Sequence, residues 1–153
     1  MQLSKNFTLS EFLISQTASR LGIDNTPSQQ VIDNLTALCQ NILQPLRDKF
    51  GPVVISSGYR SPQLNKAIGG AANSQHMLGQ AADIHMPSMA NDELARLIAK
   101  NFVFDQVILE FYTLGKPDSG WVHVSYNAAG NKREQLTATK QNGATVYLKG
   151  IVS

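Results

Sequence analysis

Two histidines and one aspartate in this sequence have the residue types and the spacing of ligands for a divalent metal ion. His76 and Asp83 lie seven positions apart, with Gly79 between them. The glycine favours a turn, and the short apolar run after it predicts a strand that carries Asp83, so both side chains can face one cavity. Imidazole nitrogen and carboxylate oxygen are ligands that zinc accepts, and a catalytic zinc site usually has three protein ligands and one water molecule. A third ligand is therefore expected elsewhere.

The segment 121–126 supplies a candidate for the third ligand. Its sequence, Trp-Val-His-Val-Ser-Tyr, is rich in β-branched and aromatic residues and predicts a strand. His123 would share one face of that strand with Trp121 and Ser125, while the valines point the other way. A single histidine in a strand is more often an ordinary half-buried residue than a ligand. The prediction therefore depends on all three candidate ligands together.

Three segments resemble the zinc D-Ala-D-Ala carboxypeptidase family, which also includes murein endopeptidases. Residues 74–83 have the pattern Ser-x-His-x-x-Gly-x-Ala-x-Asp, and residues 121–125 read Trp-Val-His-Val-Ser. Residues 3–12, Leu-Ser-Lys-Asn-Phe-Thr-Leu-Ser-Glu-Phe, resemble the opening of the short, single-domain members of that family. Two separated motifs in the same order make the resemblance specific, and it covers nearly the whole chain.

The resemblance implies a function and a set of site residues. It implies that Zn²⁺ is held by His76, Asp83 and His123, and that Arg60, in Ser-Gly-Tyr-Arg-Ser after a predicted strand, faces the substrate. A guanidinium group suits a carboxylate or a polarised carbonyl. The implied activity is hydrolysis of the peptide stems of bacterial peptidoglycan through metal-activated water, either as a D,D-carboxypeptidase or as an endopeptidase.

The catalytic base is the point at which the sequence departs from the family pattern. Several relatives carry Asp or Glu three residues before the last histidine ligand, where this chain has Gly120. Glu110 is the first choice as a replacement, because a carboxylate among apolar residues is costly to bury without a partner and its strand is expected beside that of His123. Two alternatives stay open: Glu110 faces solvent, or Asp118 in the preceding loop is the base.

Several other residues are candidates for the same pocket. Ser74, Tyr59 and Trp121 are expected to bind substrate, although an ordinary packing role competes for each of them. His85 shares a face of the predicted strand with Asp83, but the three-ligand set is complete without it.

Composition restricts the class of protein. The chain has 153 residues, which predicts a single zinc peptidase domain spanning 1–153. Its 42% hydrophobic and 16% charged content, with short apolar runs, is typical of a globular protein that does not insert into a membrane. A net charge of +2 without basic clusters does not indicate nucleic acid binding. The single Cys39 excludes an intramolecular disulfide, and a monomer is expected.

The N-terminus lacks the pattern of a secretory signal peptide. We therefore expect the protein to be made in the cytoplasm and to act on the cell wall, and in this it resembles phage lysis enzymes that reach the wall through a membrane lesion. Two non-catalytic alternatives remain. One is a zinc-containing binding module of the same fold without a working base, as in hedgehog-type relatives, and the other is a virion component.

Periodicity and capping signals predict the helices. A capping box from Thr8 to Glu11 predicts a helix to about Arg20. Thr26 as N-cap, followed by Pro27, begins the longest helix, which Pro45 should kink or break and which ends before Gly51-Pro52. Further helices are expected over 62–68 and 91–102.

The strands follow in the second half. They are predicted as a buried strand at 53–56 and further strands at 81–86, 104–111 and 121–126, with a final hairpin of 135–139 and 144–148 around Asn142-Gly143. This order favours an α+β fold whose small, largely antiparallel sheet carries the zinc site and packs against the N-terminal helices, as in hedgehog and DD-peptidase folds.

Overall fold

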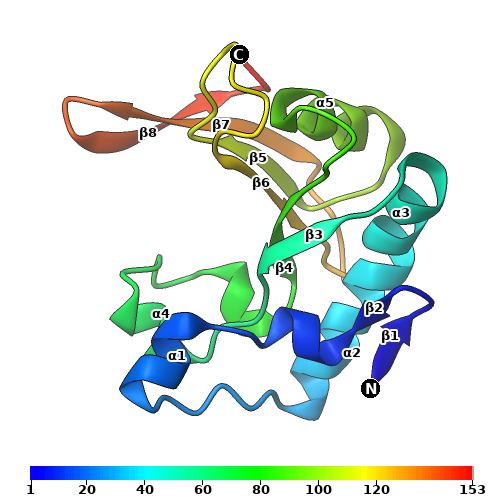
Figure 1. Ribbon diagram of the computed structural model, residues 1–153, viewed down its shortest axis with the longest axis vertical. Coiled ribbons are helices and arrows are strands. Elements are labelled where there is room, and N and C mark those ends of the chain that lie inside the picture. The colour runs from blue at the N-terminus through cyan, green and yellow to red at the C-terminus, as the bar shows by residue number, and fades with distance from the viewer. Residues whose placement is uncertain (153) are drawn as a thin grey trace.

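The sheet that carries the candidate ligands has six strands. The computed structural model describes residues 1–152, and the strand order is β3-β4-β6-β5-β7-β8 (Figure 1). Their bounds are β3 Val54–Ser57, β4 Ala81–His85, β5 Gln106–Glu110, β6 Trp121–Ser125, β7 Glu134–Gln141 and β8 Ala144–Lys149. All neighbouring strands are antiparallel except β5 and β7, which are parallel. The predicted α+β fold with a largely antiparallel sheet is confirmed.

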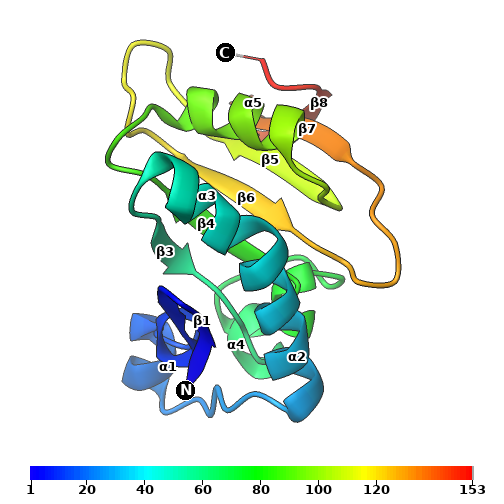
Figure 2. The same cartoon turned by 90° about the vertical axis from the view of Figure 1, so that its right-hand side faces the viewer.

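Helices cover one face of this sheet. Figure 2 shows α3 and α5 lying across the strands, with α2 continuing the line of α3. The helices are η1 Leu9–Phe12, α1 Gln16–Leu21, α2 Gln29–Leu38, the π-helix η2 Cys39–Leu43, α3 Gln44–Phe50, α4 Pro62–Ala67, η3 Gln75–Leu78 and α5 Asn91–Asn101. A separate two-stranded sheet joins β1 Gln2–Ser4 to β2 Phe7–Thr8. The opposite face of the large sheet is left for the site.

The core lies between the helices and the sheet. The apolar face of α2, η2 and α3 is buried, and it forms one cluster with Ile84 of β4 and Val122 and Val124 of β6. Cys39 lies in this cluster as a buried thiol, and burial raises its pKa to about 12. Because alternate residues of a strand point to opposite faces, packing the valines against the helices turns His123 to the other side.

The first predicted helix is wrong in its extent. Thr8 and Glu11 do form the capping box, with the Thr8 amide donating to Glu11 Oε1 at 2.9 Å, but this opens only the short helix η1. The helix ends at Phe12, and a second helix, α1, begins after three further residues. Ser15 caps α1 by accepting a hydrogen bond from the Ala18 amide at 3.1 Å. The cap at Ser15 therefore divides into two helices the segment that was predicted as one.

The start of the longest helix also differs from its prediction. Thr26 is not the N-cap, because its amide and hydroxyl donate to Asp24 Oδ1 at 2.9 and 2.6 Å. Ser28 caps α2 instead, accepting from the Val31 amide at 3.3 Å. An aspartate that binds the amide two residues on favours a turn over a helix, which delays the helix by two residues.

Pro45 breaks the regular helix as predicted. The π-helical segment Cys39–Leu43 comes just before it, and the Gln44 amide donates to the carbonyl of Cys39. Pro45 has no N–H to continue the α-helical pattern, so one wide turn accommodates it and the apolar face continues into α3.

The predictions of the strands need one correction and smaller adjustments of their bounds. The strand predicted as buried at 53–56 is β3, but it is an edge strand in which Val54 is 38% exposed. The strand predicted at 104–111 is shorter, Gln106–Glu110, whereas the final hairpin is confirmed. Within residues 1–152, no helix has both the length and the apolar character needed to cross a bilayer.

Candidate metal centre and active site

Three side chains from three elements meet on the open face of the sheet. His76 comes from η3, Asp83 from β4 and His123 from β6. Asp83 and His123 are direct partners in the register of β4 and β6, although 40 positions separate them in the chain. All three are buried, and one potential ligand atom of each lies within 4.8 Å of the others. The sheet register and the η3 turn therefore produce the cluster that the sequence predicted.

His76 is held in one orientation by the backbone. Its Nδ1 lies 2.7 Å from the carbonyl oxygen of Gly58, so Nδ1 carries the proton and Nε2 keeps its lone pair. That Nε2 atom is 3.3 Å from Asp83 Oδ1. Ser74 caps the η3 turn by accepting from the His76 amide at 3.2 Å, and Gly79 ends it with φ +72°. A histidine fixed in this way through its second nitrogen is typical of a metal ligand.

Asp83 is ionised at the centre of the cluster. Its Oδ1 lies 3.3 Å from both His76 Nε2 and His123 Nδ1. Burial favours the neutral acid, but hydrogen bonds and charge interactions with His123 and His76 outweigh it, so the pKa of Asp83 lies well below its ordinary value. Two imidazoles and one ionised carboxylate are the donor set that zinc binds. The residues present therefore fit a zinc ion.

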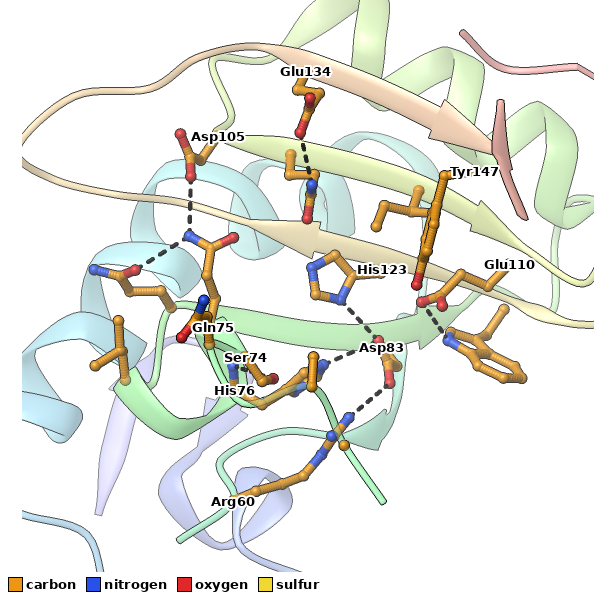
Figure 3. A pocket seen from close by; sticks show the side chains of 18 of the residues that line it. Arg60, Ser74, Gln75, His76, Asp83, Asp105, Glu110, His123, Glu134 and Tyr147 are labelled. Atoms are coloured by element: carbon orange, nitrogen blue, oxygen red, sulfur yellow. Dashed lines mark hydrogen bonds and ion pairs between the residues drawn. The ribbon is translucent and has the colours of Figure 1, made fainter. Parts of the chain in front are cut away.

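Arg60 joins the cluster from the loop after β3. Its Nη2 lies 3.7 Å from Asp83 Oδ2 (Figure 3). Its Nη1 donates to Asn65 Oδ1 at 3.2 Å. A Cβ at Gly70 would come within 2.1 Å of Asn65 Oδ1 and 2.9 Å of Arg60 Nη1. The glycine therefore leaves room for the pair of side chains that directs the guanidinium toward Asp83.

A cavity of about 910 Å³ opens over the three residues. Glu110, at the end of β5, lines it, and its Oε2 accepts a hydrogen bond of 2.9 Å from Trp121 Nε1. Burial raises the pKa of Glu110 and the charge of Asp83 raises it further, while His123, Trp121 and Arg60 oppose the shift. A carboxylate with a raised pKa beside a candidate metal site has the properties of a general base.

The fold and the motifs are those of a known peptidase family. Residues 5–125 match the family model described as Peptidase M15. The chain belongs to this family. A stretch of 68 residues, 43% of the chain, is 38% identical to the zinc D-Ala-D-Ala carboxypeptidase of Streptomyces albus G. The match spans 26% of that relative, so the chain corresponds to about a quarter of its length. Family membership and the donor set together support Zn²⁺ as the cofactor, as the sequence predicts.

The backbone of this M15 chain explains why position 120 carries no carboxylate. Gly120 has φ +63°, and a Cβ there would lie 2.0 Å from the carbonyl oxygen of Glu110 and 2.8 Å from the carbonyl carbon of Phe111. A side chain at this position would require the end of β5 to move. Gly120 directly precedes Trp121, the register partner of Glu110, so this close approach lies at the end of the β5–β6 pairing.

Asp118 and His85 lie away from the cluster. Both line a second pocket of about 400 Å³ near the start of α5, and neither lines the cavity over Asp83. Among residues 1–152, the side chains that lie close enough together to hold a metal ion are His76, Asp83 and His123, and His85 is not one of them. Of the two candidate bases, Glu110 lines the cavity over Asp83 and Asp118 does not, and His85 lies outside the group of possible ligands.

The three predicted substrate-binding residues are placed differently from one another. Trp121 and Ser74 line the cavity, although the Ser74 hydroxyl is also the cap of η3. Tyr59 does not line it: its ring is buried in the core cluster, and burial together with Asp24 raises the pKa of its phenol. Tyr59 therefore has the packing role that the sequence analysis gave as the alternative to substrate binding.

Sequence reasoning missed two polar parts of the cavity wall. Gln75 Nε2 donates to Asp105 Oδ2 at 3.0 Å, which holds the Gln75 amide beside His76 (Figure 3). Tyr147 of β8 also lines the cavity, far along the chain from the two motifs. The alternation within the predicted final strand would have placed Tyr147 and Thr145 on one face, but only the order of strands shows that this face is the one with the site.

Proposed function

We propose that this M15 chain is a zinc-dependent peptidase that hydrolyses the peptide stems of bacterial peptidoglycan. The observation that carries the proposal is the cavity: His76, Asp83 and His123 lie together in it, and Glu110 lies in the same cavity with a raised pKa. The similarity to a zinc D-Ala-D-Ala carboxypeptidase supports the class of substrate.

Each cavity residue has a distinct part in the proposed reaction. When bound, zinc supplies a Lewis acid that polarises a carbonyl oxygen and lowers the pKa of water. Glu110 would take a proton from the attacking water and give it to the leaving amine. Its raised pKa suits both transfers, because a group that binds its proton too weakly is a poor base. The hydrogen bond from Trp121 orients the ionised carboxylate before it accepts the proton.

Arg60 would stabilise negative charge on the substrate. Its Nη2 is 3.7 Å from Asp83, so the guanidinium lies close enough to the cluster to reach a group bound there. We propose that it contacts either the oxygen of the carbonyl under attack or a substrate carboxylate. Planar guanidinium groups bind both well.

We further propose that residues 1–153 form one peptidase domain, since within the described part, residues 1–152, one hydrophobic cluster contains side chains from Leu3 to Val124. The stem peptides of the wall would be its partner. Wall degradation of the phage-lysis type is one setting for this activity, and it predicts that the added protein lyses permeabilised bacterial cells. Lysis that requires the intact Glu110 carboxylate would support that setting.

The direct test is digestion of purified peptidoglycan with the zinc-loaded protein, followed by mass spectrometry of the soluble products. We expect new peptide termini whose masses identify the bond that is cut. The matched controls are the protein treated with a chelator and the Glu110→Gln variant. Release of peptides at equal rates in all three samples would exclude a zinc peptidase.

One observation favours a second candidate, a non-catalytic zinc-containing binding module of the same fold. The position that carries Asp or Glu in several relatives is Gly120 in this chain, and the backbone there excludes a side chain. If wall material is bound and zinc is retained but no peptide is released, this candidate replaces the peptidase.

A further inference from the structure

Four residues form a row across the sheet beside the metal centre. Trp121 of β6 is the register partner of Glu110 in β5, Glu110 is the partner of Ala138 in β7, and Ala138 is the partner of Tyr147 in β8. Residues that are directly opposite one another in neighbouring strands project from the same face. The row therefore places an aromatic side chain on each side of the Glu110 carboxylate.

Ala138 leaves space in the row between Glu110 and Tyr147. It is the smallest member and is fully buried, whereas Trp121, Glu110 and Tyr147 all line the cavity. Because the alanine fills little space, the Tyr147 ring can lean across it toward β5. Figure 3 shows the Tyr147 ring on the same side of the cavity as Glu110, with its hydroxyl directed toward that carboxylate.

The final hairpin is attached firmly enough to position this ring. The Phe111 amide donates to the carbonyl of Ala138 at 2.9 Å, which continues the pairing of β5 and β7. The Lys140 ammonium lies 5.6 Å from the centre of the Phe111 ring. Tyr147 itself is 56% exposed, and its hydroxyl has no hydrogen-bond partner within residues 1–152. A large aromatic side chain with an unused donor thus stands at the rim of the cavity.

We propose that Tyr147 is a substrate-binding residue that holds the peptide on the Glu110 side of the metal centre. This inference rests on the proposed function. The ring packs against the peptide, and the hydroxyl donates a hydrogen bond to one of its carbonyl oxygens. The M15 match ends at residue 125, so the whole β7–β8 hairpin, and this contact with it, lies outside the matched region.

Electrostatics favour a donor role at this end of the cavity. Glu110 is an acceptor when ionised, and the Trp121 N–H is already used to bind it. A peptide chain passing Glu110 brings both N–H and carbonyl groups, and its carbonyl oxygens need donors when water is displaced. The phenol of Tyr147 is the side-chain donor in this row that is not already engaged.

The experiment compares Tyr147→Phe, Tyr147→Ala and Leu148→Ala with the parent protein, all loaded with zinc. Leu148 is the matched control, because it is the next residue of β8, is 37% exposed and does not line the cavity. Steady-state kinetics on soluble muropeptides give kcat and KM. Calorimetric titration of the same muropeptides into each variant in a Glu110→Gln background gives Kd without turnover. Zinc content and Tm report on folding.

We expect Tyr147→Ala to raise KM and Kd by about 10- to 100-fold and Tyr147→Phe to raise them by up to about tenfold, since a net hydrogen bond of this kind is worth at most about a factor of ten. The value of kcat, the zinc content and the Tm should change little, and Leu148→Ala should resemble the parent.

The two proposals fail in different ways. If the parent protein binds muropeptides but does not cleave them, the peptidase proposal fails, and the Kd series alone then tests Tyr147. Unchanged KM and Kd in both Tyr147 variants would overturn the inference. So would a fall in kcat at constant Kd, which would mean that Tyr147 acts on Glu110 and not on the substrate. Absence of muropeptide binding by the parent protein would also overturn it.

Discussion

Trp121 Nε1 donates a hydrogen bond of 2.9 Å to Glu110 Oε2 across the paired strands β6 and β5. The two residues are direct register partners, so the pairing of β5 with β6, the strand that also carries His123, fixes the position of the carboxylate. This bond favours the ionised form of Glu110, whereas burial, which is the larger influence, disfavours it. The net effect is a raised pKa.

Replacing Trp121 should therefore change the pH dependence of catalysis. Trp121→Phe keeps an aromatic ring but removes the N–H donor, so the ionised carboxylate loses stabilisation and the pKa of Glu110 rises further. We expect the acidic limb of the kcat/KM profile to move to higher pH. The profile should be measured on soluble muropeptides. A limb that stays in place, or moves to lower pH, would show that Glu110 does not control it.

Glu110→Gln should separate function from stability. The amide keeps the shape of the side chain but cannot accept a proton, so the rate of peptide release should fall by about 10² to 10⁴. Because the pKa of Glu110 is raised by folding, its contribution to stability is present below the unfolded-state pKa and is lost as the pH rises through the folded-state pKa. At neutral pH the variant should thus be at least as stable as the parent protein.

Denaturant unfolding at pH 7 checks the stability and peptide release checks the rate. Asp118→Asn is the matched control, since Asp118 lines the separate pocket near α5. We expect it to retain the parent rate. An active Glu110→Gln variant together with an inactive Asp118→Asn variant would show that Asp118, and not Glu110, is the base.

The three candidate ligands should be needed for zinc binding, while the third histidine of the chain should not. His76→Ala, Asp83→Ala and His123→Ala each remove one of three ligand atoms that lie within 4.8 Å of one another, which weakens a three-ligand site severely. Metal analysis after dialysis should give close to one zinc per chain for the parent and for His85→Ala, and little for the other three. Full zinc content in Asp83→Ala would refute the assignment.

Arg60 should affect the rate without affecting the metal. Arg60→Ala removes a guanidinium that lies 3.7 Å from Asp83 Oδ2, and we expect a loss of about 2 to 4 kcal/mol of transition-state stabilisation with zinc retained. Arg60→Lys should recover only part of this, because the ammonium group lacks the planar pair of donors. Single-turnover rates and zinc content are the measurements. A parent-like rate in Arg60→Ala would place the side chain outside the reaction.

The position of the Arg60 guanidinium can also be disturbed by a substitution at Gly70. A methyl group at position 70 would overlap Asn65 Oδ1, to which Arg60 Nη1 donates. Gly70→Ala should therefore lower the rate in the direction of Arg60→Ala. Zinc content should remain close to that of the parent, because the atoms that the methyl group displaces belong to Asn65 and Arg60 and not to the candidate ligands. Parent-like kinetics in Gly70→Ala would show that this support is dispensable.

The sequence by itself determined which residue types the site contains and which strands carry them. His76, Asp83 and His123 follow from short motifs, and the alternation of Val122, His123 and Val124 predicts that the histidine faces away from the core. Such signals are local, since side-chain direction in a strand and capping at a turn depend on residues a few positions apart. The final hairpin was predictable for the same reason, whereas the extent of the first helix and the start of the longest one were predicted wrongly.

Only the tertiary structure decided which of these residues meet. Asp83 and His123 are 40 positions apart, and their pairing is set by the register of β4 and β6, which the packing of the whole core determines. The same packing turns Tyr59 into the core, and the pairing of β8 with β7 brings Tyr147 to the wall of the cavity. Contacts between distant strands depend on how an entire sheet fills the space beneath its helices, and no short segment of sequence contains that information.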